Sequence, residues 1–414
     1  MSERKYRVLM MVGNKNIHKD SLGKLNRGKG GIKTVKFDII FFLAVLCMAG
    51  FGILIIYSAT RSSMPGGVTD PDYYLKRQSI FLGAGLVLFT GFQFINYRKI
   101  RDLWWIAASL GIIFLIAVLL FGYEVNGSKS WIDLGLFPIQ PSEFAKIFMI
   151  ITISFLLSRR RTEKENHISF KKVILACLAA AVFIALVLLE PDFGTALIYL
   201  MIFSGMLFVS GANFFYVIAV LAATAGGFFS ALKLGIIKQY QLDRILIFLR
   251  PEVSTSGAGY NLYQSKMAIG SGGLAGKGLF LGTQTNLSYV PAHHTDFIFS
   301  VIGEELGFIG GFFVLAVMGF IIFRCFRIAA RANNSFGMLL ASGVGLMILS
   351  QVIINVGMTI GIMPIIGIPL PFLSSGGSSL ITTMLGVALV STVNIYRDTR
   401  KDHEIAYEHF SGGI

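Results

Sequence analysis

Residues 291–323 read PAHHTDFIFSVIGEELGFIGGFFVLAVMGFIIF, a polar start followed by a long apolar run. The run from 297 to 323 exceeds the roughly 20 apolar residues that a helix needs to cross a bilayer. His293, His294 and Asp296 stand just before it, and Glu304 and Glu305 stand inside it. A charge at membrane depth costs about 2.5–3.5 kcal/mol on insertion scales, so such residues are usually functional. The stretch therefore predicts a membrane helix that carries a site near its start.

The rest of the chain has a membrane composition as well. Of its 414 residues, 54% are hydrophobic and only 14% are charged. We expect an all-α polytopic membrane protein with about ten transmembrane helices in one membrane domain. The ten apolar runs lie near residues 38–59, 79–96, 103–122, 143–158, 173–190, 194–210, 214–235, 297–323, 338–360 and 377–395.

The basic residues predict the orientation of these helices. With the N-terminus inside, the cytoplasmic segments hold 25 of the 36 Lys and Arg residues, as the positive-inside rule requires. Both termini are then cytoplasmic, with a basic tail at 1–36, a membrane domain at 37–396 and a second tail at 397–414. A solvated tail attracted to anionic membrane lipid explains the basic residues better than nucleic-acid binding does. The three cysteines show no spacing typical of a disulfide or a metal site.

One long outer loop, at 238–296, separates the seventh and eighth predicted helices. It contains Arg244 in an amphipathic stretch and a glycine-rich piece at 263–278. That piece lacks the first glycine and the Ser or Thr of a phosphate-binding P-loop, so a nucleotide site is not predicted. Two interpretations stay open: a plain turn that uses glycine's freedom, or backbone approaching an anionic ligand beside Lys266 and Lys277.

A second polar cluster lies at residues 127–146, which include Lys129 and Trp131. Glu143 falls in the first turn of a predicted helix, and Lys146 is its i,i+3 neighbour on the same face. The pair is either an ion bridge that ties helices together or a charged patch at the outer mouth of a cavity.

Two further segments are unusual for a membrane protein. Residues 190–195 (EPDFGT) place Glu190 and Asp192 at a tight outer turn, where Asp192 is expected to cap the next helix. Residues 361–379 contain three prolines and several glycines in an apolar context, which excludes a regular helix. Non-helical backbone at membrane depth must be buried or line a cavity, so this segment is predicted to be re-entrant.

Asp296 allows two interpretations. It is either the N-cap of the helix that starts near Phe297 or a catalytic or ligand-binding carboxylate. Glu304 and Glu305 lie about two turns deeper, roughly 12 Å along a helix. We expect them to pair with a lysine or with backbone donors.

These segments together resemble one family, the SEDS proteins (shape, elongation, division and sporulation), which include RodA, FtsW and SpoVE. The resemblance covers about 37–396, and residues 276–279 (GKGL) and 282–285 (GTQT) are closer to the RodA branch. Ser130 stands where many members have Arg, and Ser375 stands where Tyr is common. The motifs that carry the resemblance are Trp131 with 140–143 (QPSE), 191–195 (PDFGT), 268–273 (AIGSGG), 294–299 (HTDFIF), 304–307 (EELG), 369–373 (PLPFL) and 376–379 (GGSS).

The resemblance implies a peptidoglycan glycosyltransferase of the bacterial cytoplasmic membrane. Such an enzyme polymerises lipid II into β-1,4 glycan strands at the outer face, for cell elongation and shape. It implies a class B penicillin-binding protein, a transpeptidase, as partner within the elongation machinery. The position that matches the family's catalytic aspartate is Asp296. The competing hypothesis is a flippase that transports a lipid-linked cell-wall precursor.

Inverting transfer needs a base, which we assign to Asp296, and positive charge at the leaving pyrophosphate. The activation energy resides in the lipid pyrophosphate, so no nucleotide cofactor is expected. A divalent cation stays open as an alternative source of charge. The remaining substrate-binding candidates are Glu143 to orient a lysine, Trp131 to pack on a sugar and His294 beside the base, with charge supplied by Lys129, Lys146, Arg244 or Lys277.

Overall fold

The computed structural model describes residues 37–397, apart from 62–69, 71, 126, 134, 136, 160–167, 236–241, 243, 245, 249–256 and 288. The predicted tails at 1–36 and 397–414 and much of the first half of the outer loop therefore lie outside the described residues, except Arg397. Within the described part, each of the ten apolar runs coincides with a helix. These helices are α2 (Ile39–Arg61), α3 (Tyr73–Gln93), α5 (Trp104–Phe121), α6 (Pro141–Leu156), α7 (Phe170–Leu189), α8 (Phe193–Val209), α9 (Phe214–Lys233), α13 (Ile298–Ala330), α14 (Ser335–Ile360) and α15 (Gly377–Ile395).

Seven of the described helices are long and apolar enough to cross a membrane: α2, α5, α7, α9, α13, α14 and α15. The protein is thus helical and multi-pass, as predicted, whereas the count of ten crossings stays a prediction. Helix α3 begins at Tyr73, earlier than the apolar run at 79–96, because the helix continues through polar residues that hydropathy does not mark. A short helix, α4 (Tyr97–Asp102), follows it and is capped by Asn96.

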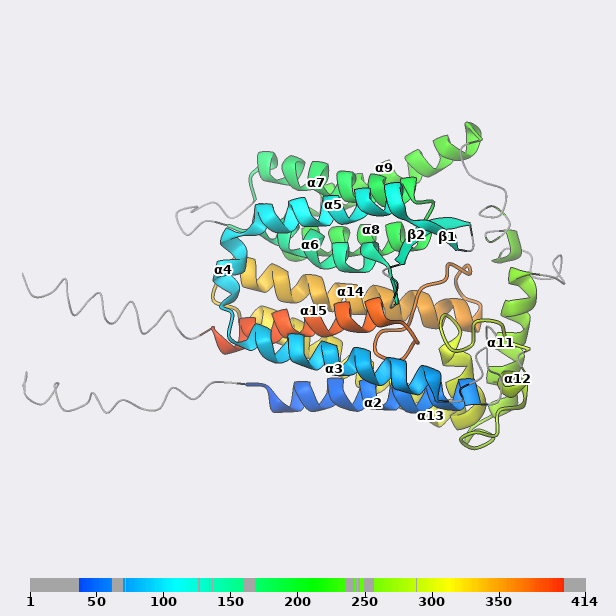
Figure 1. The fold of residues 1–414 in the computed structure, drawn as a ribbon. Helices are drawn as coiled ribbons and strands as arrows, with labels where there is room; N and C mark the ends of the chain where they lie inside the picture. Colours follow the sequence, from blue (N-terminus) through cyan, green and yellow to red (C-terminus); the bar gives the residue numbers. More distant parts are fainter. Residues whose placement is uncertain are drawn as a thin grey trace, which may run out of the picture. The chain divides into compact units, whose positions relative to one another are not determined.

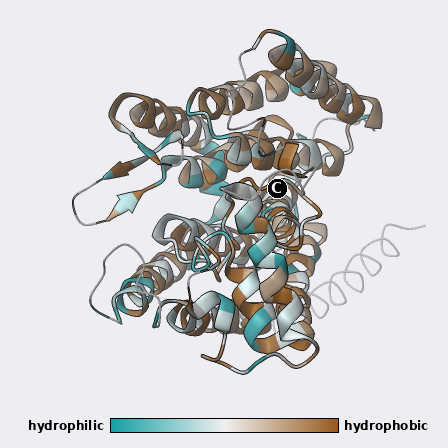
Figure 2. Ribbon diagram, turned by 90° about the vertical axis from the view of Figure 1, so that its right-hand side faces the viewer, coloured by the Kyte–Doolittle hydropathy of each residue, from teal (hydrophilic) through white to brown (hydrophobic). Residues whose placement is uncertain are grey.

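The helices run side by side along one direction, with α14 and α15 at the centre (Figure 1). In its most apolar stretch α15 is 83% buried by protein, whereas α9 is 6% buried and lies at the edge. Helix α14 packs against α6, α8, α13 and α15, and α3 packs closely on α15. Hydrophobic residues predominate along the long helices in the end-on view of Figure 2. The centre is therefore a protein core, and the outer helices present apolar side chains outward.

A small antiparallel sheet precedes α6. Its strands, in the order β1-β2-β3, are β1 (Tyr123–Val125), β2 (Ser128–Asp133) and β3 (Pro138–Ile139). Hydropathy did not predict these strands, because they are too short to produce a period-2 pattern. The sheet holds Trp131 at the same end of the helices as α11 (Ala258–Gly272) and α12 (Thr283–Asn286) (Figure 1).

The glycine-rich piece of the outer loop is partly helical and partly an interlocked turn. Its first half belongs to α11, a helix that the sequence analysis did not predict. Helix α13 breaks at Gly307, which has φ +65°. The backbone groups released by this break bond to the turn: Lys277 N and Gly278 N donate to Glu304 O and Glu305 O, and Phe308 N and Ile309 N donate to Gly273 O and Leu274 O. A Cβ on Gly276, at φ +80°, would lie 2.1 Å from the carbonyl oxygen of Glu305, so the turn interpretation holds for residues 273–278, whereas residues 263–272 are helical.

The predicted non-helical backbone of the re-entrant segment is confirmed for residues 361–376, whereas its course relative to a membrane stays a prediction. Helix α14 ends at Gly361 in a left-handed conformation, and residues 361–376 are non-helical before α15 begins. Several of these residues line a cavity, as membrane physics requires of irregular backbone.

Candidate active site

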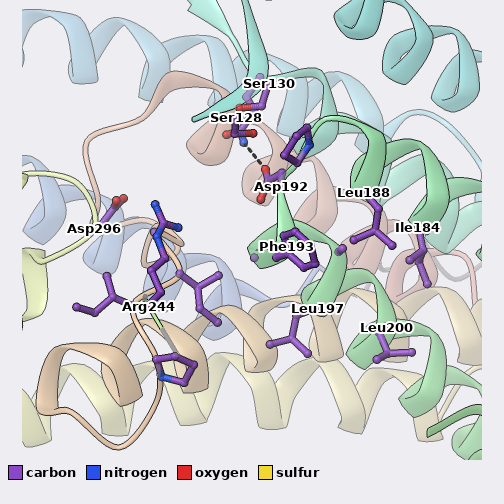
Figure 3. A pocket seen from close by; sticks show the side chains of 18 of the residues that line it. Ser128, Ser130, Ile184, Leu188, Asp192, Phe193, Leu197, Leu200, Arg244 and Asp296 are labelled. Carbon is purple, nitrogen blue, oxygen red and sulfur yellow. Dashed lines mark hydrogen bonds between the residues drawn. The ribbon is translucent and has the colours of Figure 1, made fainter. Parts of the chain in front are cut away.

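A cavity of about 1050 Å³ lies between the re-entrant segment, β2 and helices α7, α8 and α9. Figure 3 shows its two ends: Asp296 and Arg244 on one side, and the aliphatic side chains of α7 and α8 on the other. The polar lining comprises Ser128, Ser130, Trp131, Gln140, Asp192, Thr224, Arg244, Thr295, Asp296, Ser375, Ser378 and Ser379. The apolar lining includes Ile184, Leu188, Leu197, Leu200, Leu221, Phe228 and Phe229. The cavity therefore suits an amphipathic ligand with a polar head and an apolar tail.

Asp296 lies in a non-helical turn directly before α13 and faces the cavity (Figure 3). The N-cap of α13 is Phe297 and no side chain caps the helix, so the capping interpretation of Asp296 is wrong. Its Oδ2 lies 3.2 Å from where a Cβ on Gly367 would be, and Gly367 has φ +76°. Burial raises the pKa of Asp296 to about 6, partly opposed by the nearby Arg244 cation and reinforced by Asp192. A carboxylate with such a pKa can accept a proton near neutral pH.

Two charged residues of the cavity accompany Asp296. Asp192 caps α8: its Oδ1 accepts from Thr195 N at 2.9 Å and its Oδ2 from Thr195 Oγ1 at 2.8 Å. The predicted cap is confirmed, and the same Oδ2 also accepts from Gln140 Nε2 at 3.4 Å. Arg244 comes from the outer loop and is close enough to lower the pKa of Asp296. Among the described residues, the cavity lining thus contains one cationic side chain and two carboxylates.

The Glu143–Lys146 pair lies behind this surface rather than in it. Lys146 Nζ contacts Glu143 Oε1 at 2.6 Å, and both side chains are buried. The predicted i,i+3 ion bridge is confirmed, and neither residue is among those that line the cavity. Both residues lie in the first two turns of α6, which begins at Pro141, immediately after the cavity residue Gln140.

Three other predicted residues also lie off the cavity lining. Lys129 Nζ donates to Leu119 O at 2.7 Å, at the end of α5. Lys277 Nζ contacts Glu304 Oε1 at 2.7 Å, which confirms the expected pairing of that glutamate. The ring of His294 contacts Tyr74 edge-on, and burial, together with His293, lowers the pKa of His294 to about 4. A neutral imidazole packed on a tyrosine is a structural neighbour of Asp296.

Sequence reasoning missed several residues of the cavity. Gln140, Ser128 and Ser378 line it although none was proposed as a site residue. Ser378 Oγ accepts from Gln140 N at 3.0 Å, which joins the start of α15 to the start of α6. The only sequence signal for them is their place in the motifs 140–143 and 376–379. Among the described residues, no three His, Cys, Asp or Glu side chains form a metal-binding group.

Comparison with known proteins identifies the family. A family profile described as "Cell cycle protein", covering FtsW, RodA and SpoVE, matches residues 38–399. The chain belongs to this family. The peptidoglycan glycosyltransferase MrdB of Escherichia coli K12 is 35% identical over 363 residues, which cover 88% of this chain and 95% of MrdB. The peptidoglycan glycosyltransferase RodA of Treponema pallidum is 33% identical, over 86% of this chain and 97% of that protein.

Solved structures of the family share the fold. A chain from a peptidoglycan synthase complex that coordinates polymerization and crosslinking has a TM-score of 0.73 at 30% identity, covering 88% of this chain and 99% of that chain. The rod shape determining protein RodA of Thermus thermophilus has a TM-score of 0.65 at 28% identity, with the same coverage. The expected SEDS architecture is therefore confirmed, and the chain is a multi-pass bacterial membrane protein.

Proposed function

We propose that this SEDS protein is a peptidoglycan glycosyltransferase that polymerises lipid II into β-1,4 glycan strands at the outer face of the membrane. The observation that carries the proposal is the placement of Asp296. Its carboxylate faces a cavity that is polar at one end and aliphatic at the other. A lipid-linked sugar has the same two-part chemistry. The family's named relatives, MrdB and RodA, are peptidoglycan glycosyltransferases, which supports the same reaction class for this chain.

The cavity suggests how a substrate lies. The polyprenyl chain fits against Ile184, Leu188, Leu197 and Leu200, which lie on the α7 and α8 side (Figure 3). Burying apolar surface there contributes about 25 cal/mol per Å². The sugar and pyrophosphate then lie toward Asp296, where Trp131 offers an aromatic face to the sugar.

Asp296 acts as the general base. The acceptor hydroxyl attacks the anomeric carbon, its proton passes to the Asp296 carboxylate, and the bond to the lipid pyrophosphate breaks with the electron pair leaving on phosphate oxygen. Direct displacement inverts the anomeric centre, as a β-linked product from an α-linked donor requires. General-base catalysis typically contributes about 10²–10⁴-fold.

The leaving pyrophosphate requires positive charge. Of the four basic residues proposed from the sequence, Arg244 is among the residues that line the cavity, and Lys129, Lys146 and Lys277 are not. Arg244 is therefore our candidate for the pyrophosphate, because a guanidinium binds phosphate oxygens in a bidentate manner. A divalent cation stays an open alternative source of this charge, since Mg²⁺ is commonly held by one or two carboxylates plus substrate phosphates.

We further propose a class B penicillin-binding protein as the partner, within the elongation machinery. A structural relative belongs to a complex in which polymerization is coordinated with crosslinking, and this supports the assignment.

A reconstitution experiment tests the function. The purified protein, with its transpeptidase partner if activity requires it, is supplied with lipid II, and glycan polymer is measured. Polymer should form with the wild type and disappear with Asp296→Ala, provided that the variant elutes and melts like the wild type. Undiminished polymer from the variant would overturn the base assignment. No polymer, with lipid II crossing vesicle membranes instead, would favour the flippase hypothesis.

A further inference from the structure

The carbonyl oxygens of three consecutive residues at the site are fixed by side chains or backbone from other elements. His294 O accepts from Ser375 N at 2.9 Å, and Thr295 O accepts from Ser374 Oγ at 2.6 Å. Asp296 O accepts from Asn355 Nδ2 at 2.8 Å. The turn lies outside the regular part of α13, so the hydrogen-bond ladder of the helix does not fix these carbonyls.

Asn355 differs from the other donors because it bonds two segments at once. Its Nδ2 donates to Asp296 O and also to Ile368 O, at 2.7 Å. A carboxamide has two N–H bonds on this nitrogen, so one side chain satisfies both carbonyls. Asn355 is fully buried in α14, a helix whose most apolar stretch is 78% buried. A polar side chain in such a place is expected to have a specific partner.

One of the two carbonyls bonded by Asn355 belongs to Asp296 itself, and the other belongs to Ile368 in the re-entrant segment. Ile368 follows Gly367, the residue whose missing Cβ leaves room for Asp296 Oδ2. The hydrogen bonds of Asn355 therefore link the backbone of Asp296 to that of Ile368. The neighbouring Gly367 in turn lies against the Asp296 carboxylate. If this amide is removed, the main chain of Asp296 and the wall beside its carboxylate can shift relative to each other.

We propose that Asn355 is a positioning residue for glycosyl transfer, which holds Asp296 at a fixed place relative to the re-entrant segment. This inference rests on the proposed role of Asp296 as the base. Asn355 does not line the cavity, so it touches neither sugar nor pyrophosphate. Its loss should reduce turnover rather than substrate binding, because a misplacement of about 1 Å in a reacting group can reduce the rate roughly 10²-fold.

The test uses Asn355→Leu, which has similar shape but no donor, and a matched control on the same helix. Gln351 is one turn away, equally buried, and has no hydrogen-bond partner for its amide among the described residues. Polymerisation of lipid II is measured over a range of substrate concentrations, together with melting temperature. We expect Asn355→Leu to lower kcat by tenfold to a hundredfold with KM changed less than about threefold. Gln351→Leu should keep kcat within about twofold.

The outcomes separate the hypotheses. A folded Asn355→Leu variant with wild-type kcat, or a Gln351→Leu variant with the same loss, overturns the positioning role. If Asn355→Leu does not fold, Asn355→Asp keeps the shape and at most one donor, and full kcat from that variant overturns the proposal equally. Asp296→Asn is run in the same assay. If it keeps its activity, the base assignment fails; if it is inactive while Asn355→Leu is normal, only the present inference fails.

Discussion

Asp296 and Glu304 are carboxylates only eight residues apart, yet they have opposite surroundings. Glu304 is fully buried and accepts from Lys277 Nζ, Gln284 N and Thr285 N. Asp296 faces the cavity, and no hydrogen bond to its carboxylate is found among the described residues. A carboxylate whose oxygens are all occupied stabilises the fold, whereas one that faces a cavity can accept a proton from a ligand. The two carboxylates therefore differ both in exposure and in their partners: Glu304 is fully buried, whereas Asp296 is partly exposed to the cavity.

Neutralising each carboxylate without changing its shape should show the largest difference between the roles of Asp296 and Glu304. Asp296→Asn should lower kcat by about 10²–10⁴-fold, because the base is lost, while the melting temperature stays the same or rises. Glu304→Gln should do the reverse and destabilise the protein by about 1–3 kcal/mol, because buried donors lose a charged acceptor. Glycan synthesis and thermal unfolding of both variants in the same detergent measure the two effects. Equal loss of kcat in two folded variants would contradict the distinction.

A substitution of Arg244 tests whether the cation beside Asp296 contributes to the reaction. Arg244→Gln should lower kcat/KM roughly ten- to hundredfold, since a hydrogen bond to a charged group is worth about 1.5–3 kcal/mol. The catalytic efficiency is measured from the steady-state polymerisation of lipid II. Lys277→Gln is the matched control, because Lys277 pairs with Glu304 and does not line the cavity. A control that loses as much catalytic efficiency as Arg244→Gln, at equal folding, would argue against the assignment of Arg244 to the pyrophosphate.

The pH dependence of the rate probes Asp296 directly. The base must be ionised, so activity should rise with pH through a midpoint near the pKa of about 6 and disappear below it. Arg244 lowers the pKa of Asp296, so Arg244→Gln should move the midpoint upward. Initial rates of both proteins from about pH 5 to pH 8 test the direction of this shift in the midpoint. A midpoint that stays fixed or moves downward would show that the titrating group is not Asp296 beside Arg244.

A substitution of Glu190 should have the smallest effect on the rate, although Glu190 is a buried acid close to the site. Burial raises the pKa of Glu190 to about 9, with Asp192 adding to the rise, so the side chain is neutral at pH 7. Glu190→Gln should therefore change kcat by less than about twofold. A raised folded-state pKa means that stability falls as pH rises from about 4.5 to about 9, because the unfolded chain ionises first.

The amide variant removes that pH dependence. Glu190→Gln should melt above the wild type at pH 8 and close to it at pH 4, as measured by thermal unfolding at both values. A variant that is less stable at pH 8 would indicate that Glu190 is ionised in the folded protein.

Local rules predicted part of the site correctly. The cap by Asp192 and the Glu143–Lys146 bridge each join residues three positions apart, so helix geometry alone places them. The same kind of reasoning was wrong about Asp296 as a cap, because the chain makes an additional non-helical turn before α13. The hydrogen bonds between residues 273–278 and the break at Gly307 could not be predicted by local rules either, since they join backbone groups from two distant segments.

Sequence patterns were enough to predict the membrane class, the ten helical segments, the non-helical stretch before α15 and the aspartate that the family motif marks. These follow from hydropathy, proline and glycine content and short motifs, all of which act along the chain. In contrast, folding is needed to show that Arg244 lines the cavity and that Asn355 bonds to the backbone of Asp296. Asn355 meets Asp296 across 59 residues and Ser374 meets Thr295 across 79. Such contacts depend on how the helices pack, and no local periodicity records that packing.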